Sequence, residues 1–248
     1  MIFSRICALG TTYDIFPVSE LPSDTERYKD ERDGSVVLAF LLPSADADAE
    51  VIVPGATAPS PSAALAASLF LGRVRGLPLD EYDLLSSGKI YRVRYDSEND
   101  NYCVLMPKCK LLSSNTRIFV NEMPLLVSLM QNESELISVS ECSDAEHFTD
   151  LSLRRIYTEL RPHKTSGAVA FSISENGVMA RGFFPQMNPE RVLDIAVAVA
   201  SILRVGTARA SLLVYLCDST LVCRAQGQYL AVCGENIAPL TFSAPDIL

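Results

Sequence analysis

The sequence lacks the features of a nucleic-acid-binding or membrane protein. It carries 21 Lys and Arg against 30 Asp and Glu, a formal net charge of −9, and its basic residues are scattered, with no run longer than a pair such as Arg154-Arg155. Because nucleic-acid phosphates are bound by clustered Lys and Arg, a nucleic-acid partner is not expected. The longest apolar helix patterns cover about a dozen residues, well short of the roughly 20 that span a bilayer. We therefore expect no membrane partner either.

A leader peptide is not recognisable. Residues 1–9, MIFSRICAL, read as a strand and lack the basic, apolar and small-residue order of a signal peptide. We therefore expect a cytoplasmic protein. Apolar residues make up 48% and charged residues 21% of the chain, which is ordinary for a globular protein. The 248 residues suffice for one large domain or two small ones, each with its own core.

Ligands for a metal ion are scarce. Histidine occurs only as His147 and His163, and the cysteines are Cys7, Cys103, Cys109, Cys142, Cys217, Cys223 and Cys233. No two cysteines have the two-to-four-residue gap of a zinc knuckle. Most of them lie in apolar runs such as NYCVLM, where a free cysteine packs as a small hydrophobe. We predict reduced, structural cysteines, no metal site and no cofactor.

The stretch from Glu50 to Gly76, EVIVPGATAPSPSAALAASLFLGRVRG, organises the first half of the chain. It reads as a short strand, a loop of small residues and proline, and a helix that ends at about Arg75. Ser60 followed by Pro61 is a helix-start signal, because Ser caps free N–H groups and Pro fits the first helical position. The helix is apolar almost all round and must be buried on every side. We predict that it is the central helix of a domain.

The second half repeats this arrangement. Asn188-Pro189-Glu190 again combines a capping residue with proline and adds a carboxylate that suits the helix dipole. The helix that follows, to Val205, is also apolar nearly all round. The two starts lie about 130 residues apart, and antiparallel strands follow each helix, which indicates an internal duplication.

These patterns predict an α+β protein of two pseudo-equivalent domains. Each domain is expected to be a mostly antiparallel sheet curled around its central buried helix. The predicted domains are residues 1–112 and 113–236, with packing of residues 237–248 back onto the first domain as an option. Between the two central helices, residues 149–161 have the spacing of a surface helix, with Leu151, Ile156 and Leu160 on one side.

Several segments resemble the diaminopimelate epimerase-like superfamily, which includes proline racemases and phenazine-biosynthesis isomerases. Residues 1–16, MIFSRICALGTTYDIF, are similar to the epimerase start, and residues 36–56 to its strand–turn–strand segment. Residues 122–125 stand where the family has Gly-Asn-Pro-His, and residues 168–171 where it has Asn-Ile-Gly-Phe. The resemblance covers essentially the whole chain in order. It implies two similar domains, each a sheet around a central helix, with a cleft between them.

The resemblance also implies a chemistry that this chain does not carry. Inverting a carbon next to a carboxylate needs a base on one face and an acid on the other. The family places one cysteine per domain beside the N-terminus of a central helix, where the dipole favours a thiolate. The first of these positions falls on Pro54, or near Pro61 with a shifted gap, and the second near Glu190 or Arg191. We therefore expect no diaminopimelate epimerase activity.

The positions that hold the substrate in the family differ as well. Its early Asn-Asp pair corresponds to Thr11-Thr12, its Asn-Pro-His to Met123-Pro124-Leu125, and its later Asn to Ala168. A buried site that loses the partners of its ligand's charges binds that ligand more weakly, by several kcal/mol.

Two function classes remain. The first is a non-catalytic relative that keeps the fold for binding or assembly, with a small carboxylate in the interdomain cleft and a homodimer as expected partners. The second is a cofactor-independent isomerase of a small carboxylic or amino acid that uses carboxylates, as the phenazine-type relatives do. Glu190 and Asp194 would then be acid and base. Both residues are also explained as first-turn charges on the helix dipole. We favour the non-catalytic interpretation.

Four residues are candidates for binding an anion at the two helix starts. They are Gly55, Ser60, Ser62 and Asn188. A helix N-terminus attracts a carboxylate or phosphate through its free N–H groups and its dipole. The simpler explanation for Ser60 is a capping role within the chain.

Overall fold

The structure is a computed structural model, and it describes most of the chain in two compact units. The described residues are 2–25, 28, 35–76, 79–97, 100–120, 123–133, 135–145, 149–175, 177–186, 191–203, 211–216, 219–234 and 240–243. One unit comprises residues 1–105 and 236–248, and the other comprises residues 106–235. None of the helices in the described ranges is long and apolar enough to cross a membrane.

The first unit is a mixed sheet packed on one helix. Its strands are β1 (Ile2–Ala8), β2 (Thr11–Pro17), β3 (Val37–Leu42), β4 (Ala49–Ile52), β5 (Glu81–Ser86), β6 (Lys89–Asp96), β7 (Asn101–Pro107) and β16 (Leu240–Ser243). They are ordered β16-β1-β2-β3-β4-β5-β6-β7. The β2–β3 and β4–β5 pairs are parallel, and the chain's last described strand, β16, pairs with β1.

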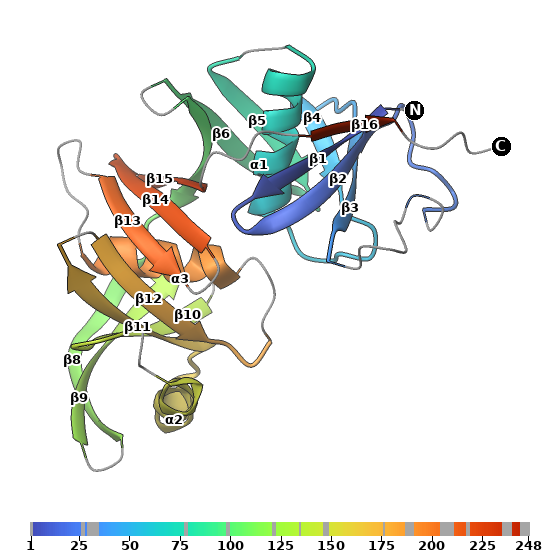
Figure 1. The fold of residues 1–248 in the computed structure, drawn as a ribbon. Helices are drawn as coiled ribbons and strands as arrows, with labels where there is room; N and C mark the ends of the chain where they lie inside the picture. The colour runs from blue at the N-terminus through green and yellow to red at the C-terminus, as the bar shows by residue number, and fades with distance from the viewer. Residues whose placement is uncertain are drawn as a thin grey trace. The chain divides into compact units, whose positions relative to one another are not determined.

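The helix of this unit is α1 (Pro61–Leu69), and all of its residues are buried. It contacts β1, β2, β4, β5 and β6, and Figure 1 shows it among these strands. The predicted start, with Ser60 as cap and Pro61 as first helical residue, is confirmed. The predicted end at about Arg75 is confirmed, but the last part of the helix, from Phe70 to Val74, is a π-helix, η2. Within η2, Gly72 leaves the space that the Tyr102 hydroxyl occupies.

The second unit has the same succession of strands. They are β8 (Lys110–Val120), β9 (Met123–Asn132), β10 (Glu135–Glu141), β11 (Gly167–Ser174), β12 (Gly177–Phe183), β13 (Ser211–Leu216), β14 (Ser219–Gln226) and β15 (Tyr229–Gly234). Their order is β8-β9-β10-β11-β12-β13-β14-β15. The β10–β11 and β12–β13 pairs are parallel. Counted in the order of the sheet, the third strand is therefore parallel to the fourth in both units, and the fifth is parallel to the sixth.

Two helices belong to the second unit. The central one, α3 (Arg191–Ile202), contacts strands from β9 to β15, and its residues from Ile195 to Ala200 are buried. It connects β12 to β13, as α1 connects β4 to β5 in the first unit. The chain therefore repeats one topology, with a buried helix at the same crossover in each unit.

The other helix, α2 (Asp150–Leu160), lies on the surface and continues into a 3-10 turn, η3 (Arg161–His163). Its predicted buried side is partly wrong, because Leu151 is 58% exposed and Leu153 is buried. A helix turns by 100° per residue. Leu153, three positions before Ile156, therefore lies on the same side of the helix as Ile156, and Leu151, five positions before it, does not. Ile156 and Leu160 pack with Val127 and Leu129 of β9.

Candidate site at the helix N-termini

Hydroxyl groups of the chain itself form hydrogen bonds at the N-terminus of α1. Ser60 Oγ accepts a hydrogen bond from the Ala63 N–H at 3.0 Å, and the Ser60 N–H donates to Ser86 Oγ at 3.1 Å. The Tyr13 hydroxyl lies 2.5 Å from Ser62 Oγ and 3.3 Å from Ser60 Oγ. Tyr13, Ser60, Ser62 and Ser86 are all buried. We call these four residues the hydroxyl cluster.

Two of the residues predicted to bind an anion, Ser60 and Ser62, have a structural role in the hydroxyl cluster. Ser60 caps the helix, and the side chain of Ser62 is hydrogen-bonded to Tyr13. The third candidate, Gly55, lies exposed in the loop between β4 and α1, at a φ of 80° that favours glycine. The fourth, Asn188, lies outside the described residues, as does the catalytic candidate Glu190.

At the N-terminus of α3, charged side chains take the place of hydroxyls. Arg191 Nη1 donates to Glu135 Oε2 at 2.5 Å and to Asp194 Oδ2 at 2.8 Å, and its Nη2 donates to Glu135 Oε1 at 3.1 Å. Asn132 Nδ2 donates to Asp194 Oδ1 at 2.8 Å. Asp194, the second catalytic candidate, therefore has both carboxylate oxygens engaged. We call Asn132, Glu135, Arg191 and Asp194 the arginine cluster.

The guanidinium of Arg191 lies over the aromatic ring of Phe184, and two glycines lie next to this ring. The guanidinium carbon of Arg191 lies 4.8 Å from the ring centroid of Phe184, which is buried. A Cβ at Gly167 would meet this ring at 2.3 Å, and a Cβ at Gly182 would meet it at 3.3 Å. Gly167 therefore leaves the space that the ring occupies, whereas a Cβ at Gly182 would only be in tight contact with it. Among the described groups, Arg191 Nε is buried and without a hydrogen-bond partner.

The charges of the arginine cluster stabilise one another. The hydrogen bond from Arg191 lowers the pKa of the Glu135 carboxyl, although partial burial opposes this. The same hydrogen bond, with that to Asp194, raises the pKa of the Arg191 guanidinium. A carboxylate with a lowered pKa is a weaker proton acceptor, so Glu135 is poorly suited to act as a general base near neutral pH.

The sequence contained one signal for this cluster. Arg191 and Asp194 are three positions apart, a spacing at which opposite charges meet on a helix. The roles of Asn132 and Glu135 had no such signal, because they are 62 and 56 positions from their partners in the arginine cluster.

Comparison with known proteins rests on solved structures, since no family model and no curated protein matches this sequence. A phenazine biosynthesis PhzC/PhzF protein from Clostridium difficile matches with a TM-score of 0.63 at 13% identity, covering 100% of this chain and 99% of that one. A PhzF-family protein from Bacillus anthracis matches with a TM-score of 0.63 at 11% sequence identity, and the match covers 98% of both chains. A predicted epimerase from Pseudomonas aeruginosa matches with a TM-score of 0.54 at 11% sequence identity. This match covers 98% of this chain and 97% of that one.

This chain has the PhzF fold. The match runs over the full length, so the resemblance that the sequence shows to the diaminopimelate epimerase-like superfamily is confirmed at the level of the fold. At identities of 11% to 13% it says nothing about which residues act.

Four of the described thiols, those of Cys103, Cys109, Cys223 and Cys233, are buried, whereas Cys7 and Cys142 are partly buried. Burial raises the pKa of the Cys109 thiol to about 12 and that of Cys223 to about 12, and it also raises the pKa of Cys142. Cys109 is additionally held by its backbone N–H, which donates to Ser201 Oγ at 2.9 Å. A buried thiol with a raised pKa is a poor nucleophile. Within the described ranges, no three His, Cys, Asp or Glu side chains are grouped as a metal site would need.

Proposed function

We propose that this protein uses the PhzF fold as a binding or assembly module without racemase activity. One observation carries the proposal: both oxygens of Asp194, the catalytic candidate that the structure describes, accept hydrogen bonds from Asn132 and Arg191. These two donors hold the carboxylate toward the arginine cluster, whereas a general base must lie within hydrogen-bond reach of the substrate's proton. An ion pair of this kind is instead suited to fixing the first turn of α3.

The N-terminus of α1 supports the same proposal. In a cysteine-based epimerase this position would present a thiol and open N–H groups to a carboxylate. Here Ser60 and Ser62 lie in the buried hydroxyl cluster. The residues at the positions of the family's cysteines, Pro54 or Pro61 and Glu190 or Arg191, offer no thiol.

We propose that each unit is a pseudo-equivalent domain with its sheet curled around α1 or α3. The contacts of each helix with strands from both sides of its crossover support this arrangement. As ligand we propose the small carboxylate that the resemblance to the epimerase-like superfamily implies, bound by residues other than Ser60 and Ser62, whose hydroxyls bond within the chain. A homodimer and a cytoplasmic location complete the proposal. The mass of the protein in solution, measured by light scattering, tests the dimer.

The alternative is a cofactor-independent isomerase that uses carboxylates. Two observations favour it: a relative in fold is a predicted epimerase, and the arginine cluster gathers Glu135 and Asp194 around one guanidinium. In this alternative, Glu190 and Asp194 exchange a proton with the carbon next to a substrate carboxylate.

Exchange of the α-proton with solvent deuterium separates the two functions. The full chain is incubated in deuterium oxide with a panel of amino and hydroxy acids, and deuterium uptake is followed by NMR and mass spectrometry. We expect no uptake above the uncatalysed rate. Line broadening of the same compounds in ligand-observed NMR would support a carboxylate-binding module.

Three variants make the outcome decisive. Glu190→Gln and Asp194→Asn remove the candidate acid and base, and Asp150→Asn is the control, because Asp150 lies exposed at the start of α2. Exchange that is present in the native protein, lost in either of the first two variants and kept in Asp150→Asn would overturn the proposal and establish the isomerase.

A further inference from the structure

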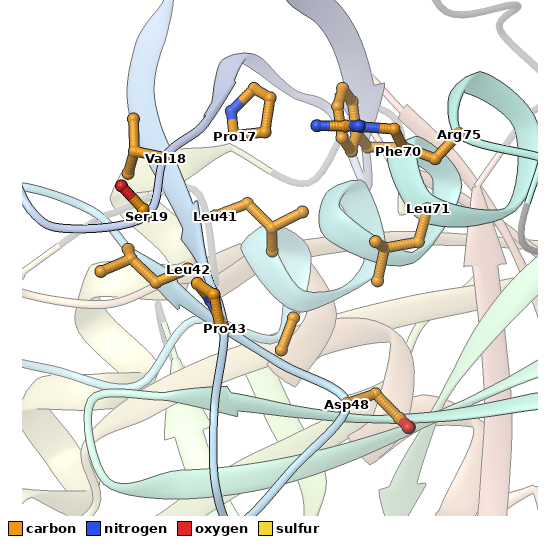
Figure 2. A pocket seen from close by; sticks show the side chains of 11 residues that line it. Pro17, Val18, Ser19, Leu41, Leu42, Pro43, Asp48, Phe70, Leu71 and Arg75 are labelled. Atoms are coloured by element: carbon orange, nitrogen blue, oxygen red, sulfur yellow. The ribbon is translucent and has the colours of Figure 1, made fainter.

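A cavity of about 490 Å³ lies in the first unit, at the carboxyl end of α1. This is the end of the helix opposite to the hydroxyl cluster. The walls are mostly apolar and come from β2, β3 and the π-helix η2, as Figure 2 shows. They include Pro17, Val18, Leu41, Leu42, Phe70 and Leu71. The volume is within the range of small-molecule sites, roughly 300 to 1,000 Å³.

The π-helix builds one side of this cavity. Its Arg75 N–H donates to the Phe70 carbonyl at 3.0 Å, five residues back, which is the hydrogen bond of a π-turn. This turn presents Phe70, Leu71 and Arg75 to the cavity. The π-helix is rare, and where a single π-turn occurs in a helix it often lies at a functional site. The π-turn and the cavity therefore lie at the same place in the first unit.

One cationic group borders the cavity. The guanidinium carbon of Arg75 lies 5.8 Å from the ring centroid of Phe70, and Figure 2 shows the two side chains together at the cavity. Among the described residues, no carboxylate forms an ion pair with Arg75, and its side chain is exposed. The ring and the carbonyl end of the helix both favour a cation at this point. The guanidinium is thus held at the rim with its donors directed to solvent or to a ligand.

The acidic group on the lining is already engaged. Asp48 Oδ2 accepts a hydrogen bond from the Asp83 N–H at 2.8 Å. Its charge remains on the lining, where Figure 2 shows it well apart from Arg75. A ligand with a second anionic end would meet this carboxylate and be repelled. The lining therefore combines an apolar floor, one cation and one anion in fixed places.

We propose that this cavity binds an apolar monocarboxylate, with its hydrocarbon part against Leu41, Leu42 and Leu71 and its carboxylate on Arg75. A guanidinium and a carboxylate pair through two parallel hydrogen bonds, which fixes the orientation of the ligand. The hydrocarbon part gains free energy by leaving water. The cavity shares no lining residue with either helix N-terminus, so the proposal can be tested independently of the function proposed above.

Calorimetric titration of the full chain with octanoate tests the proposal. We expect saturable binding at one site per chain, and weaker binding of octylammonium and of octanedioate. Arg75→Gln should weaken octanoate binding by about tenfold or more, since a hydrogen bond to a charged group contributes about 1.5 to 3 kcal/mol. The matched control is Arg154→Gln in the other unit, where the guanidinium carbon lies 5.3 Å from the Phe183 ring centroid. It should leave the affinity unchanged.

A second variant closes the cavity without touching the charge. Ser19 is an exposed residue on the lining, and Ser19→Trp should abolish octanoate binding while the circular dichroism spectrum stays native. Octanoate binding that is absent, that is equal in the Arg75→Gln and Arg154→Gln variants, or that persists in Ser19→Trp would overturn the proposal. The deuterium-exchange result is unaffected by any of these outcomes.

Discussion

The hydroxyl oxygens of Tyr13 and Ser62 lie 2.5 Å apart, although 49 positions separate the two residues in sequence. This buried hydrogen bond joins β2 to the first turn of α1. We expect Tyr13→Phe to lower the free energy of unfolding by about 1 kcal/mol, the usual net contribution of one hydrogen bond. Urea unfolding followed by circular dichroism measures it.

A double-mutant cycle isolates this contact. Tyr13→Phe and Ser62→Ala should be non-additive, with a coupling free energy of about 0.5 kcal/mol or more. Tyr13→Phe combined with Arg94→Gln is the control, because Arg94 is exposed and pairs with Glu81 elsewhere in the same unit. That second pair should be additive. If the two cycles behave alike, the hydroxyl contact is not energetically significant.

The arginine cluster predicts a pH-dependent contribution to stability. Arg191 lowers the pKa of Glu135 in the folded protein, so Glu135 stabilises the fold at neutral pH and this contribution is lost as pH falls through the lowered pKa. Glu135→Gln should therefore destabilise the protein at pH 7 by about 1 kcal/mol or less, because the pair is partly exposed. The difference from the native protein should shrink below about pH 4, where the unfolded carboxyl is protonated.

Glu141→Gln provides the control for this pH series. Glu141 lies exposed at the other end of β10, so its substitution should change the stability little at either pH. Unfolding free energies at several pH values between 3 and 7 are compared for the two variants. A loss in Glu135→Gln that is the same at pH 3 and pH 7 would show that the ion pair with Arg191 does not contribute.

The central helices could be predicted from the sequence because their signals are local. The residues of α1 are apolar almost all round, and Ser60-Pro61 marks the start. In β6, buried and exposed side chains alternate from Ile90 to Arg94, which is also a local pattern. The change to a π-helix at Phe70 could not be predicted, because an apolar sequence fits both helices. There the contact between Gly72 and Tyr102, 30 residues apart, is part of the structure.

The candidate site was less predictable because its contacts are distant in sequence. The strand β8 has no clean alternation of apolar and polar residues, because its pairing with β9 shifts register between Leu111 and Ser113 and between Ser113 and Thr116. Likewise, the carboxylate of Asp194 fits a helix dipole or a catalytic base equally well in sequence. Only the positions of Asn132 and Arg191 distinguish the two.

The close packing of β12 on α3 gives a third prediction. A Cβ at Gly182 would lie 2.5 Å from Cδ1 of Ile195. Gly182→Ala should therefore destabilise the second unit by about 1 to 3 kcal/mol, as overpacking does in cores. Ile195→Val removes the nearest carbon and should recover part of this loss in the double variant, measured by urea unfolding. Simple additivity of the two substitutions would mean that the helix shifts to accommodate the new methyl group.

The thiols give the last prediction, and it bears on the proposed function. Burial raises the pKa of Cys109 and of Cys223 to about 12, so at pH 8 almost none of either is thiolate. Iodoacetamide should leave both unmodified in the native protein and should modify both in urea, as peptide mass spectrometry would show. Cys7 is partly exposed and serves as the internal comparison. Rapid native modification of Cys109 would reveal an accessible thiolate and reopen a thiol-based isomerase. If both thiols stay unreactive, neither Cys109 nor Cys223 serves as the base of an isomerase.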